Sequence, residues 1–172
     1  MIDFGTIVDM ELLIEEFSTQ DRLNQFDSML IASPQVECPL EEQFTPGLYI
    51  RERFVPAGTL FTTYTWKETH PFRCIIGELL IWESGKGWQL FEAPCKGITK
   101  KGTKRVVYAI TDVIWETLHA NPTNTKDPKL LHDMLFKSYD NPYVDEAKLL
   151  EINKVRERKG IDPSTLSKNK VI

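Results

Sequence analysis

A β-hairpin is predicted by one stretch near the middle of the chain, ELLIWESGKGWQLF at residues 78–91. Two apolar runs, each of the length of a β-strand, flank the short segment Ser84-Gly85-Lys86-Gly87. Glycine reaches the positive φ angles that tight turns require, and two such runs joined by a glycine-containing turn are typical of a hairpin. We therefore expect two antiparallel strands here.

The same pattern of short β-prone runs continues on both sides of this hairpin. From Phe44 to His119 the chain consists of short runs rich in Val, Ile, Thr, Tyr, Phe and Trp, interrupted by Pro46-Gly47, Pro56-Ala57-Gly58 and Gly97. Short β-prone runs separated by Gly and Pro indicate an all-β sandwich or barrel.

The last of these runs alternates cleanly between two sets of residues. Val113, Trp115, Thr117 and His119 form one set, and the residues between them form the other. Because successive side chains of a strand point to opposite faces, the two sets are predicted to lie on opposite sides of a sheet.

Helical periodicity is confined to the two ends of the chain. Apolar residues recur at intervals of three and four residues within 7–17, 23–30, 130–135 and 144–158. Asp127-Pro128 resembles a helix N-cap followed by proline at the first helical position. We predict an N-terminal helical arm at residues 1–38, a β-barrel at 39–122, and a C-terminal helical arm and tail at 123–172.

The charge of the chain argues against nucleic acid as a partner. The chain of 172 residues fits one domain, and its formal net charge of -4 offers no global positive field for a polyanion. A local basic cluster is expected to be a solvated turn and not a nucleic-acid contact; it comprises Lys96, Lys100, Lys101, Lys104 and Arg105.

Targeting and cysteine patterns add two expectations. No apolar run is long enough to span a membrane and the N-terminus lacks the pattern of a signal peptide, so we expect a cytoplasmic protein that contacts no membrane. Cys38, Cys74 and Cys95 are odd in number and contain no Cys-x-x-Cys pair, which favours reduced thiols.

Two further motifs bracket the β region, PAGTL at residues 56–60 and WETLH at residues 115–119. Between them the chain resembles the small single-domain cupins, in particular uncharacterised cupin-like proteins encoded by bacteriophages and prophages. This resemblance covers somewhat under half of the chain. It implies a mainly β fold, a cupin-type jelly-roll β-barrel whose two antiparallel sheets close over a narrow pocket, here with helical arms at both ends.

Metal-binding cupins carry two motifs that supply three His and one Glu to a metal ion. Both can be aligned with this chain, the first with its closing glycine at Gly77 and the second with its central glycine at Gly102. By this alignment the three His positions hold Tyr64, Trp66 and Arg105, and the Glu position holds His70. Trp offers a metal no lone pair, Arg stays cationic, and Tyr must first lose its proton. The resemblance therefore implies a lost metal site, and we expect no cofactor.

The residues at these positions are the candidate lining of the barrel pocket. Together with one residue of the alternating strand they are Tyr64, Trp66, His70, Arg105 and His119. Large rings in place of smaller ligands favour a plugged barrel, and an aromatic ligand pocket is the alternative. A different metal set, Glu68 with His70 and His119, stays open as two His and one carboxylate. His132 is expected on the surface of a helix.

The function that these features favour is non-catalytic. A structural or accessory protein, of a bacteriophage by the resemblance, would use the barrel as a scaffold and its amphipathic arms for protein–protein contacts. Cupins commonly pair through their sheets, so the expected partners are further copies of the chain or other phage proteins. Such a protein would reside in the host cytoplasm or in the virion.

Two alternatives stay open. One is a small-molecule cupin enzyme, either metal-dependent through Glu68, His70 and His119 or metal-free and isomerase-like. In the metal-free form His70 would act as general base, Tyr64 as acid, and Arg105 would orient an anionic substrate. The other is a binding module for a small anion, built on Arg105 and the lysines around it. The fold by itself does not choose among these functions.

Overall fold

The computed structural model describes residues 23, 27, 30 and 35–137. The chain divides into two compact units, residues 1–34 and residues 35–172, and the fold below is that of the second unit. The helices predicted within 7–17 and 144–158 lie outside the described residues, as does most of the one predicted at 23–30.

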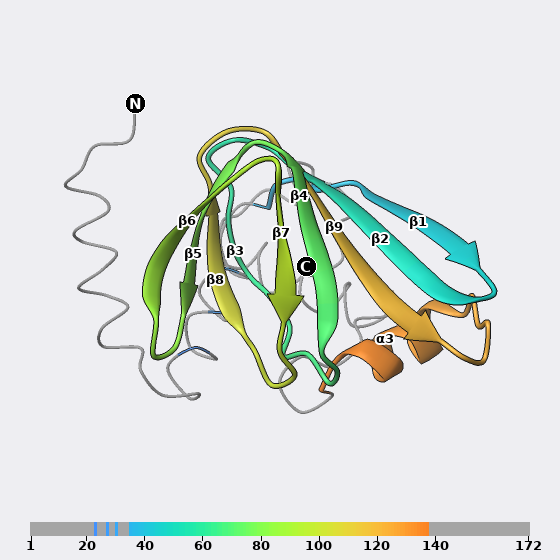
Figure 1. Cartoon of the computed structure of the whole chain (residues 1–172). Helices are drawn as coiled ribbons and strands as arrows, with labels where there is room; N and C mark the ends of the chain where they lie inside the picture. The colour runs from blue at the N-terminus through green and yellow to red at the C-terminus, as the bar shows by residue number, and fades with distance from the viewer. Residues whose placement is uncertain (1–22, 24–26, 28–29, 31–34, 138–172) are drawn as a thin grey trace, which may run out of the picture. The chain divides into compact units, whose positions relative to one another are not determined.

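Two antiparallel sheets make up this unit (Figure 1). The first has the strand order β1-β2-β9-β4-β7, with β1 Leu40–Thr45, β2 Gly47–Val55, β9 Val113–Asn121, β4 His70–Ile76 and β7 Cys95–Thr99. The second has the order β3-β8-β5-β6, with β3 Leu60–Thr62, β8 Arg105–Ala109, β5 Glu78–Glu83 and β6 Gly87–Glu92.

The strand order identifies the architecture. From β2 onward the chain passes between the sheets, with β2, β4, β7 and β9 in one sheet and β3, β5, β6 and β8 in the other. Eight strands divided in this way between two facing antiparallel sheets form a jelly roll. The predicted fold class, a mainly β jelly roll of the cupin type, is confirmed.

The hairpin at residues 78–91 forms as predicted. Strands β5 and β6 pair along their whole length, from Glu78 opposite Glu92 to Glu83 opposite Gly87. The amide of Lys86 donates to the carbonyl of Glu83, and Gly85 has a φ of 78°. The glycine therefore supplies the left-handed backbone conformation that closes the turn.

The core lies between the two sheets. Its largest apolar cluster consists of Cys38, Val55, Cys74, Leu79, Ile81, Val107, Ala109 and Val113. Strand β9 contributes the set predicted to share one face, since Val113, Trp115 and Thr117 all face the interior cavity described below. The period of two read from the sequence is confirmed for this strand.

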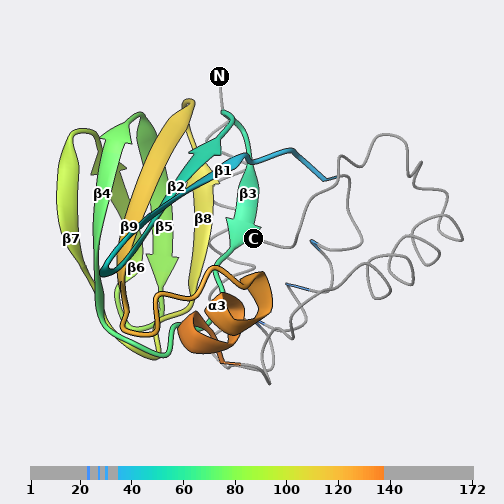
Figure 2. The same cartoon turned by 90° about the vertical axis from the view of Figure 1, so that its right-hand side faces the viewer.

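Helix α3, Pro128–Leu135, follows the last strand and begins where the sequence predicts it. The carboxylate of Asp127 accepts hydrogen bonds from the amides of Lys129 and Leu130, and proline occupies the first turn. The helix lies across one end of the strands (Figure 2).

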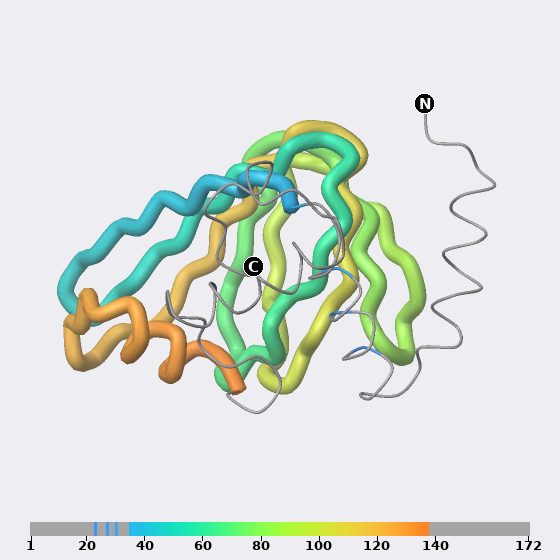
Figure 3. The backbone as a smooth tube through the Cα atoms, turned by 180° about the vertical axis from the view of Figure 1, so that it is seen from behind, coloured from blue at the N-terminus to red at the C-terminus, as the bar shows by residue number. Residues whose placement is uncertain are grey.

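The chain on either side of α3 is tied to the barrel. The amide of Gly47, the first residue of β2, donates to the side chain of Asn124. Figure 3 shows the loop that leads from β9 to the helix beside the turn between β1 and β2. After the helix, Phe136 forms an isolated antiparallel bridge with Trp66. The C-terminal segment up to residue 137 is therefore part of the barrel wall at this end.

No helix among the described residues is both long enough and apolar enough to cross a membrane.

Candidate functional site

The inward side chains of the barrel are polar at one end of its axis and apolar at the other. On β8 the inward side chains run from Arg105 to Val107 and Ala109, and on β2 they run from Arg51 and Arg53 to Val55. The other strands change in the same direction: Thr117 to Val113 on β9, His70 to Cys74 on β4, Thr99 to Cys95 on β7, and Glu83 to Leu79 on β5. We call these the polar end and the apolar end.

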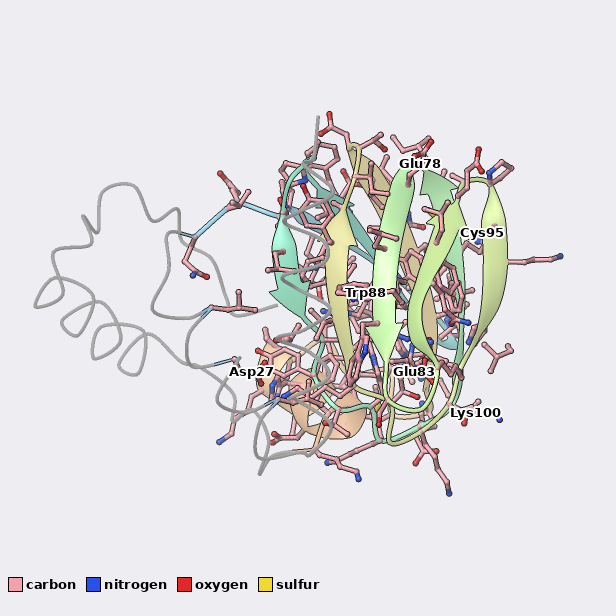
Figure 4. The ribbon with its side chains drawn as sticks, turned by 90° about the vertical axis from the view of Figure 1, so that its left-hand side faces the viewer. Asp27, Glu78, Glu83, Trp88, Cys95 and Lys100 are labelled. Atoms are coloured by element: carbon pink, nitrogen blue, oxygen red, sulfur yellow. The ribbon has the colours of Figure 1, made fainter. Side chains whose placement is uncertain are left out.

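The position of helix α3 distinguishes the two ends. Glu83 lies at the lower end of β5 in Figure 4, near Lys100, whereas Glu78 and Cys95 lie toward the upper end. The apolar residues of the helix, Leu131 and Leu135, pack with Tyr64, Trp66 and Phe136 into a second buried cluster. This cluster closes the polar end of the barrel.

A cavity of about 90 Å³ occupies the barrel interior. Its lining combines aliphatic and aromatic side chains with eight non-indole side chains that carry polar groups: Arg51, Arg53, Arg105, His70, Tyr64, Thr63, Thr99 and Thr117. A single water needs only about 10–15 Å³ on such a scale. The expectation of a plugged barrel therefore needs correction: Tyr64 and Trp66 help to close the polar end, but the interior behind them is not filled.

Arg105 is held firmly in the wall of this cavity. It is 7% exposed, its Nε donates to Glu83 at 3.1 Å, and its Nη1 donates to the hydroxyl of Thr99 at 2.9 Å. The guanidinium also lies over the ring of Phe72, 5.7 Å from the centroid. Although burial raises the pKa of Glu83, hydrogen bonds from Lys86 and Arg105 keep it below its usual value, so the pair is ionised.

The other two arginines face the cavity from β2 and make no ion pair with a carboxylate among the described residues. Arg53 donates from Nη1 to the carbonyl of Cys38 at 2.7 Å, and Arg51 lies over the ring of Phe136 at 5.4 Å. Burial and the neighbouring charge of Arg51 lower the pKa of Arg53 to about 10. Both guanidiniums therefore remain cationic at neutral pH.

His70 contributes the one nitrogen acceptor of the lining. The residue is 3% exposed, and its Nδ1 lies 3.2 Å from the carbonyl oxygen of Glu68. Its Nε2 is buried and has no hydrogen-bond partner among the described residues. Burial, together with the charges of Arg105 and Arg51, lowers the pKa of His70 to about 4, so the ring is neutral at pH 7.

The positions that the cupin alignment singled out come together around this cavity. Tyr64, Trp66, His70 and Arg105 all line it, and each is less than a tenth exposed. Tyr64 and Trp66 come from the irregular segment between β3 and β4, where their rings pack against Phe136 with centroids 4.5 Å and 4.8 Å away. The aligned ligand positions therefore share one site.

His119 lies beside the cavity and is not among the residues that line it. Its ring stacks on Trp66 at 5.1 Å and lies 4.5 Å from His70, and its Nε2 is 2.9 Å from the hydroxyl of Thr117. The expected inward direction is right, but His119 stands two residues past Thr117, the last lining residue of β9. Burial and the proximity of His70 and Arg51 lower its pKa to about 2.

The alternative metal set does not assemble. Glu68 is exposed, whereas His70 and His119 are buried, and only the backbone carbonyl of Glu68 contacts His70. Among the described residues no group of three or more His, Cys, Asp and Glu side chains is arranged to hold a metal ion. Arginines that face the cavity would repel a cation in any case, so the residues present do not fit a metal centre.

Two further expectations need correction. Lys104 and Arg105 are buried, so the basic cluster is not a uniformly solvated turn; Lys96, Lys100 and Lys101 are exposed. His132 is also buried, 9% exposed, with its ring 5.2 Å from Tyr64. It lies on the face of α3 that packs on the barrel, because it follows Leu131 and precedes Leu135 by three residues.

Arg51 and Arg53 are the site residues that sequence reasoning missed. Because side chains alternate along β2, one face of the strand carries Arg51, Arg53 and Val55, and the other carries Ile50, Glu52 and Phe54. Hydrophobicity would assign the face with Ile50 and Phe54 to the core, yet the arginine face points inward. The inward face of β2 follows from its pairing with β9, in which Arg51 lies opposite Thr117 and Val55 opposite Val113. A prediction of this pairing was the one signal that could have identified the two arginines.

Comparisons with known proteins concern the fold. No family model matches the chain, and no curated protein matches its sequence. Among similar solved structures is an RmlC-like cupin family protein with a double-stranded β-helix fold from Methanocaldococcus jannaschii, with 14% identity, 51% of this chain and 84% of that chain covered, and a TM-score of 0.43.

Two further solved structures have comparable similarity. An uncharacterised conserved protein with a double-stranded β-helix domain from Klebsiella pneumoniae has 12% identity, covers 54% of this chain and 84% of its own, and has a TM-score of 0.44. Ectoine synthase from P. lautus has 13% identity, with 52% and 69% covered and a TM-score of 0.42. The cupin-type fold assigned above rests on the strand order and not on these similarities.

Proposed function

We propose that the barrel binds a small organic anion in its interior cavity. The observation that carries this proposal is the charge of the lining: three arginines face the cavity, and no Asp or Glu is among its described lining residues. Glu83 pairs with Arg105 from the rim, while Arg51 and Arg53 have no carboxylate partner among the residues that the structure describes. A bound anion would supply the missing counter-charge.

The energetic cost of this lining supports a binding role. Arg51 and Arg53 are partly buried, and a cation that loses part of its hydration without gaining a counter-ion destabilises the fold that holds it. Arginine also presents its N–H donors in a fork that matches the two oxygens of a carboxylate. The apolar end of the same cavity offers Val55, Val107 and Val113 to a hydrocarbon portion.

Binding is favoured over the metal-free enzyme with His70 as general base. A general base is most effective when its pKa lies near the working pH. The pKa of His70, about 4, makes it a weak base at neutral pH. The same ring is, however, well suited to accept a hydrogen bond.

Isothermal titration calorimetry with acetate, propionate, glycolate and phosphate tests the proposal directly. We expect at least one of these anions to bind, and Arg51→Met to weaken that binding by about ten-fold or more, since it removes a charge-assisted contact. Arg73→Met is the matched control, because Arg73 lies on the outer face of β4, paired with Glu116 and 54% exposed. Absence of binding by all four anions, or equal losses in the two variants, would contradict the proposal.

A second candidate function rests on the outer face of the first sheet. Ile75 on β4 and Ile98 on β7 are 40% and 60% exposed, and Ile98 pairs directly with the exposed Pro71. Apolar side chains grouped on a sheet face support protein–protein contact. Together with the resemblance to phage-encoded cupins, they support the structural or accessory role, with partners that are further copies of the chain or phage proteins.

Light scattering coupled to size exclusion tests this second role. If copies associate through this face, the wild-type protein should be an oligomer, and Ile98→Glu should convert it to a smaller species. Leu90→Glu is the control, because Leu90 is 59% exposed on β6 of the other sheet and its substitution should leave the oligomer intact. A wild-type monomer that is also absent from purified phage particles would remove the candidate.

A further inference from the structure

Two of the three cysteines lie directly opposite each other in the first sheet. Strands β4 and β7 are antiparallel, and their register places Cys74 opposite Cys95. Directly opposed residues of an antiparallel pair point to the same face of the sheet, with their Cα atoms about 4.5–5.5 Å apart. A disulfide spans Cα atoms that are about 4.4–6.8 Å apart. The backbone therefore already holds the two cysteines at a separation that a disulfide can bridge.

The two side chains are also in contact. Burial, the charge of Cys95 and a hydrogen bond between the two side chains together raise the pKa of Cys74 to about 11. The pKa of Cys38, the third cysteine, is also raised by burial, but the charges that act on it are those of Arg53 and Glu37. Cys74 and Cys95 therefore form a pair, and Cys38 provides an internal control.

The two thiols of the pair differ in their access to solvent. Cys74 is 1% exposed within the apolar cluster, whereas Cys95 is partly exposed at the start of β7, the edge strand of the first sheet (Figure 4). The thiolate is the form that reacts, and the high pKa of Cys74 keeps its thiol protonated at neutral pH. A dissolved oxidant therefore meets Cys95 first, with Cys74 beside it as the resolving thiol.

We propose that Cys74 and Cys95 are a site of oxidation by hydrogen peroxide, which joins them in an intramolecular disulfide between β4 and β7. The thiolate of Cys95 attacks one peroxide oxygen, the O–O bond breaks, and the sulfur becomes a sulfenic acid while the other oxygen leaves as water. The sulfur of Cys74 then attacks the sulfur of Cys95, so that an S–S bond replaces the S–O bond and a second water leaves. The two thiols supply the two electrons that reduce the peroxide.

This site is independent of the proposed anion binding, because neither cysteine is among the described residues that line the cavity. Strand β7 has one neighbour in its sheet, so hydrogen bonds of the sheet hold it on one side only. A covalent link to β4 fastens this edge strand, whose other end carries Thr99, the partner of Arg105.

Peptide mapping of the native protein before and after treatment with hydrogen peroxide tests the site. Trypsin cleaves after Lys and Arg, which places Cys74 on the peptide 74–86 and Cys95 on the peptide 87–96. We expect oxidation to lower the number of free thiols from three to one and to link these two peptides. Dithiothreitol should restore all three thiols, since a disulfide is reversible.

Two single substitutions provide the controls. Cys38→Ser removes a buried thiol outside the pair and should leave the link between the two peptides unchanged. Cys95→Ser removes the exposed member of the pair, and we expect the treated variant to keep Cys38 and Cys74 as free thiols. The main result comes from the wild-type protein and does not depend on either variant.

Oxidation of Cys95 to the sulfinic acid while Cys74 stays a free thiol would overturn the proposal. A disulfide between Cys95 residues of two copies, or one that includes Cys38, would overturn it as well, and so would a protein whose three thiols all survive the treatment. Each of these outcomes leaves the anion-binding proposal intact.

Discussion

The two ends of the barrel interior are built on the same strands and differ in almost every other respect. At the apolar end, side chains such as Val113 and Leu79 are completely or almost completely buried in close contact. At the polar end, the same strands present Thr117 and Glu83, and the cavity is lined by arginines and a histidine. Strand alternation decides which residues face inward, and the position along each strand decides whether they stabilise the fold or face a ligand.

The two glycines that the cupin alignment singled out offer the strongest test, because one lies near each end. Gly77 has a φ of 90°, and a Cβ there would lie 2.2 Å from the carbonyl oxygen of Asp112. Gly102 has a φ of 80° and open space around it. We expect Gly77→Ala to lower the free energy of unfolding by about 3 kcal/mol or more, and Gly102→Ala by about 1 kcal/mol. Urea denaturation measures both, and equal losses would contradict the assignment.

Truncation of a buried side chain at the apolar end should have the next largest effect on stability. Ile81 is 2% exposed inside the apolar cluster, so Ile81→Ala should lower the free energy of unfolding by about 3 kcal/mol through lost burial and a residual cavity. Leu90→Ala, in the neighbouring strand but 59% exposed, should change it by about 0.5 kcal/mol or less. A loss of similar size in the two variants would show that the apolar end does not dominate stability.

Acid should weaken the polar end specifically. The pKa values of His70 and His119 are lowered to about 4 and about 2 from 6.5, so the unfolded chain binds more protons than the folded one below about pH 6.5. Stability is therefore complete above that pH and falls as the pH decreases. Between pH 7 and pH 5 we expect a loss of about 2 kcal/mol for each histidine. Chemical denaturation of His119→Gln at pH 7 and pH 5 should show a decrease in the free energy of unfolding that is about 2 kcal/mol smaller than in the wild-type protein. The same decrease in both proteins would contradict the role of His119.

The smallest of these effects concerns two glutamates on strand β5. Glu83→Gln keeps an acceptor but removes the charge that pairs with Arg105, and it should lower the free energy of unfolding by about 1–2 kcal/mol. Glu78, at the opposite end of the strand, makes no ion pair among the described residues, and Glu78→Gln should have little effect. Chemical denaturation of the two variants compares them, and a larger loss in Glu78→Gln would refute the expectation.

Local signals in the sequence predicted the elements well. The glycine turn of the hairpin, the Asp127-Pro128 start of α3 and the alternation of β9 each depend on residues close together in the chain. The jelly roll was predicted from the resemblance of residues 56–119 to the small single-domain cupins. These features require no knowledge of distant contacts.

The contents of the barrel were harder to predict, because they depend on packing between strands far apart in sequence. Hydrophobicity misassigned the inward face of β2, and no local pattern distinguishes a plugged barrel from one with a cavity of about 90 Å³. The burial of His132 likewise depends on which face of α3 meets the barrel. Resemblance did identify Tyr64 and Arg105 as inward positions, but it did not predict the two further arginines beside them.

The sign of charge inside this barrel is opposite to that of the chain as a whole. The chain has a formal net charge of -4, while the cavity is lined by guanidinium groups. Dissolved salt screens fields in water beyond about 10 Å but acts much less on enclosed groups. An anion that enters the cavity, as proposed above, would meet repulsion from the net charge at long range and attraction from the guanidinium groups close to the cavity, and dissolved salt would weaken the repulsion more than the attraction.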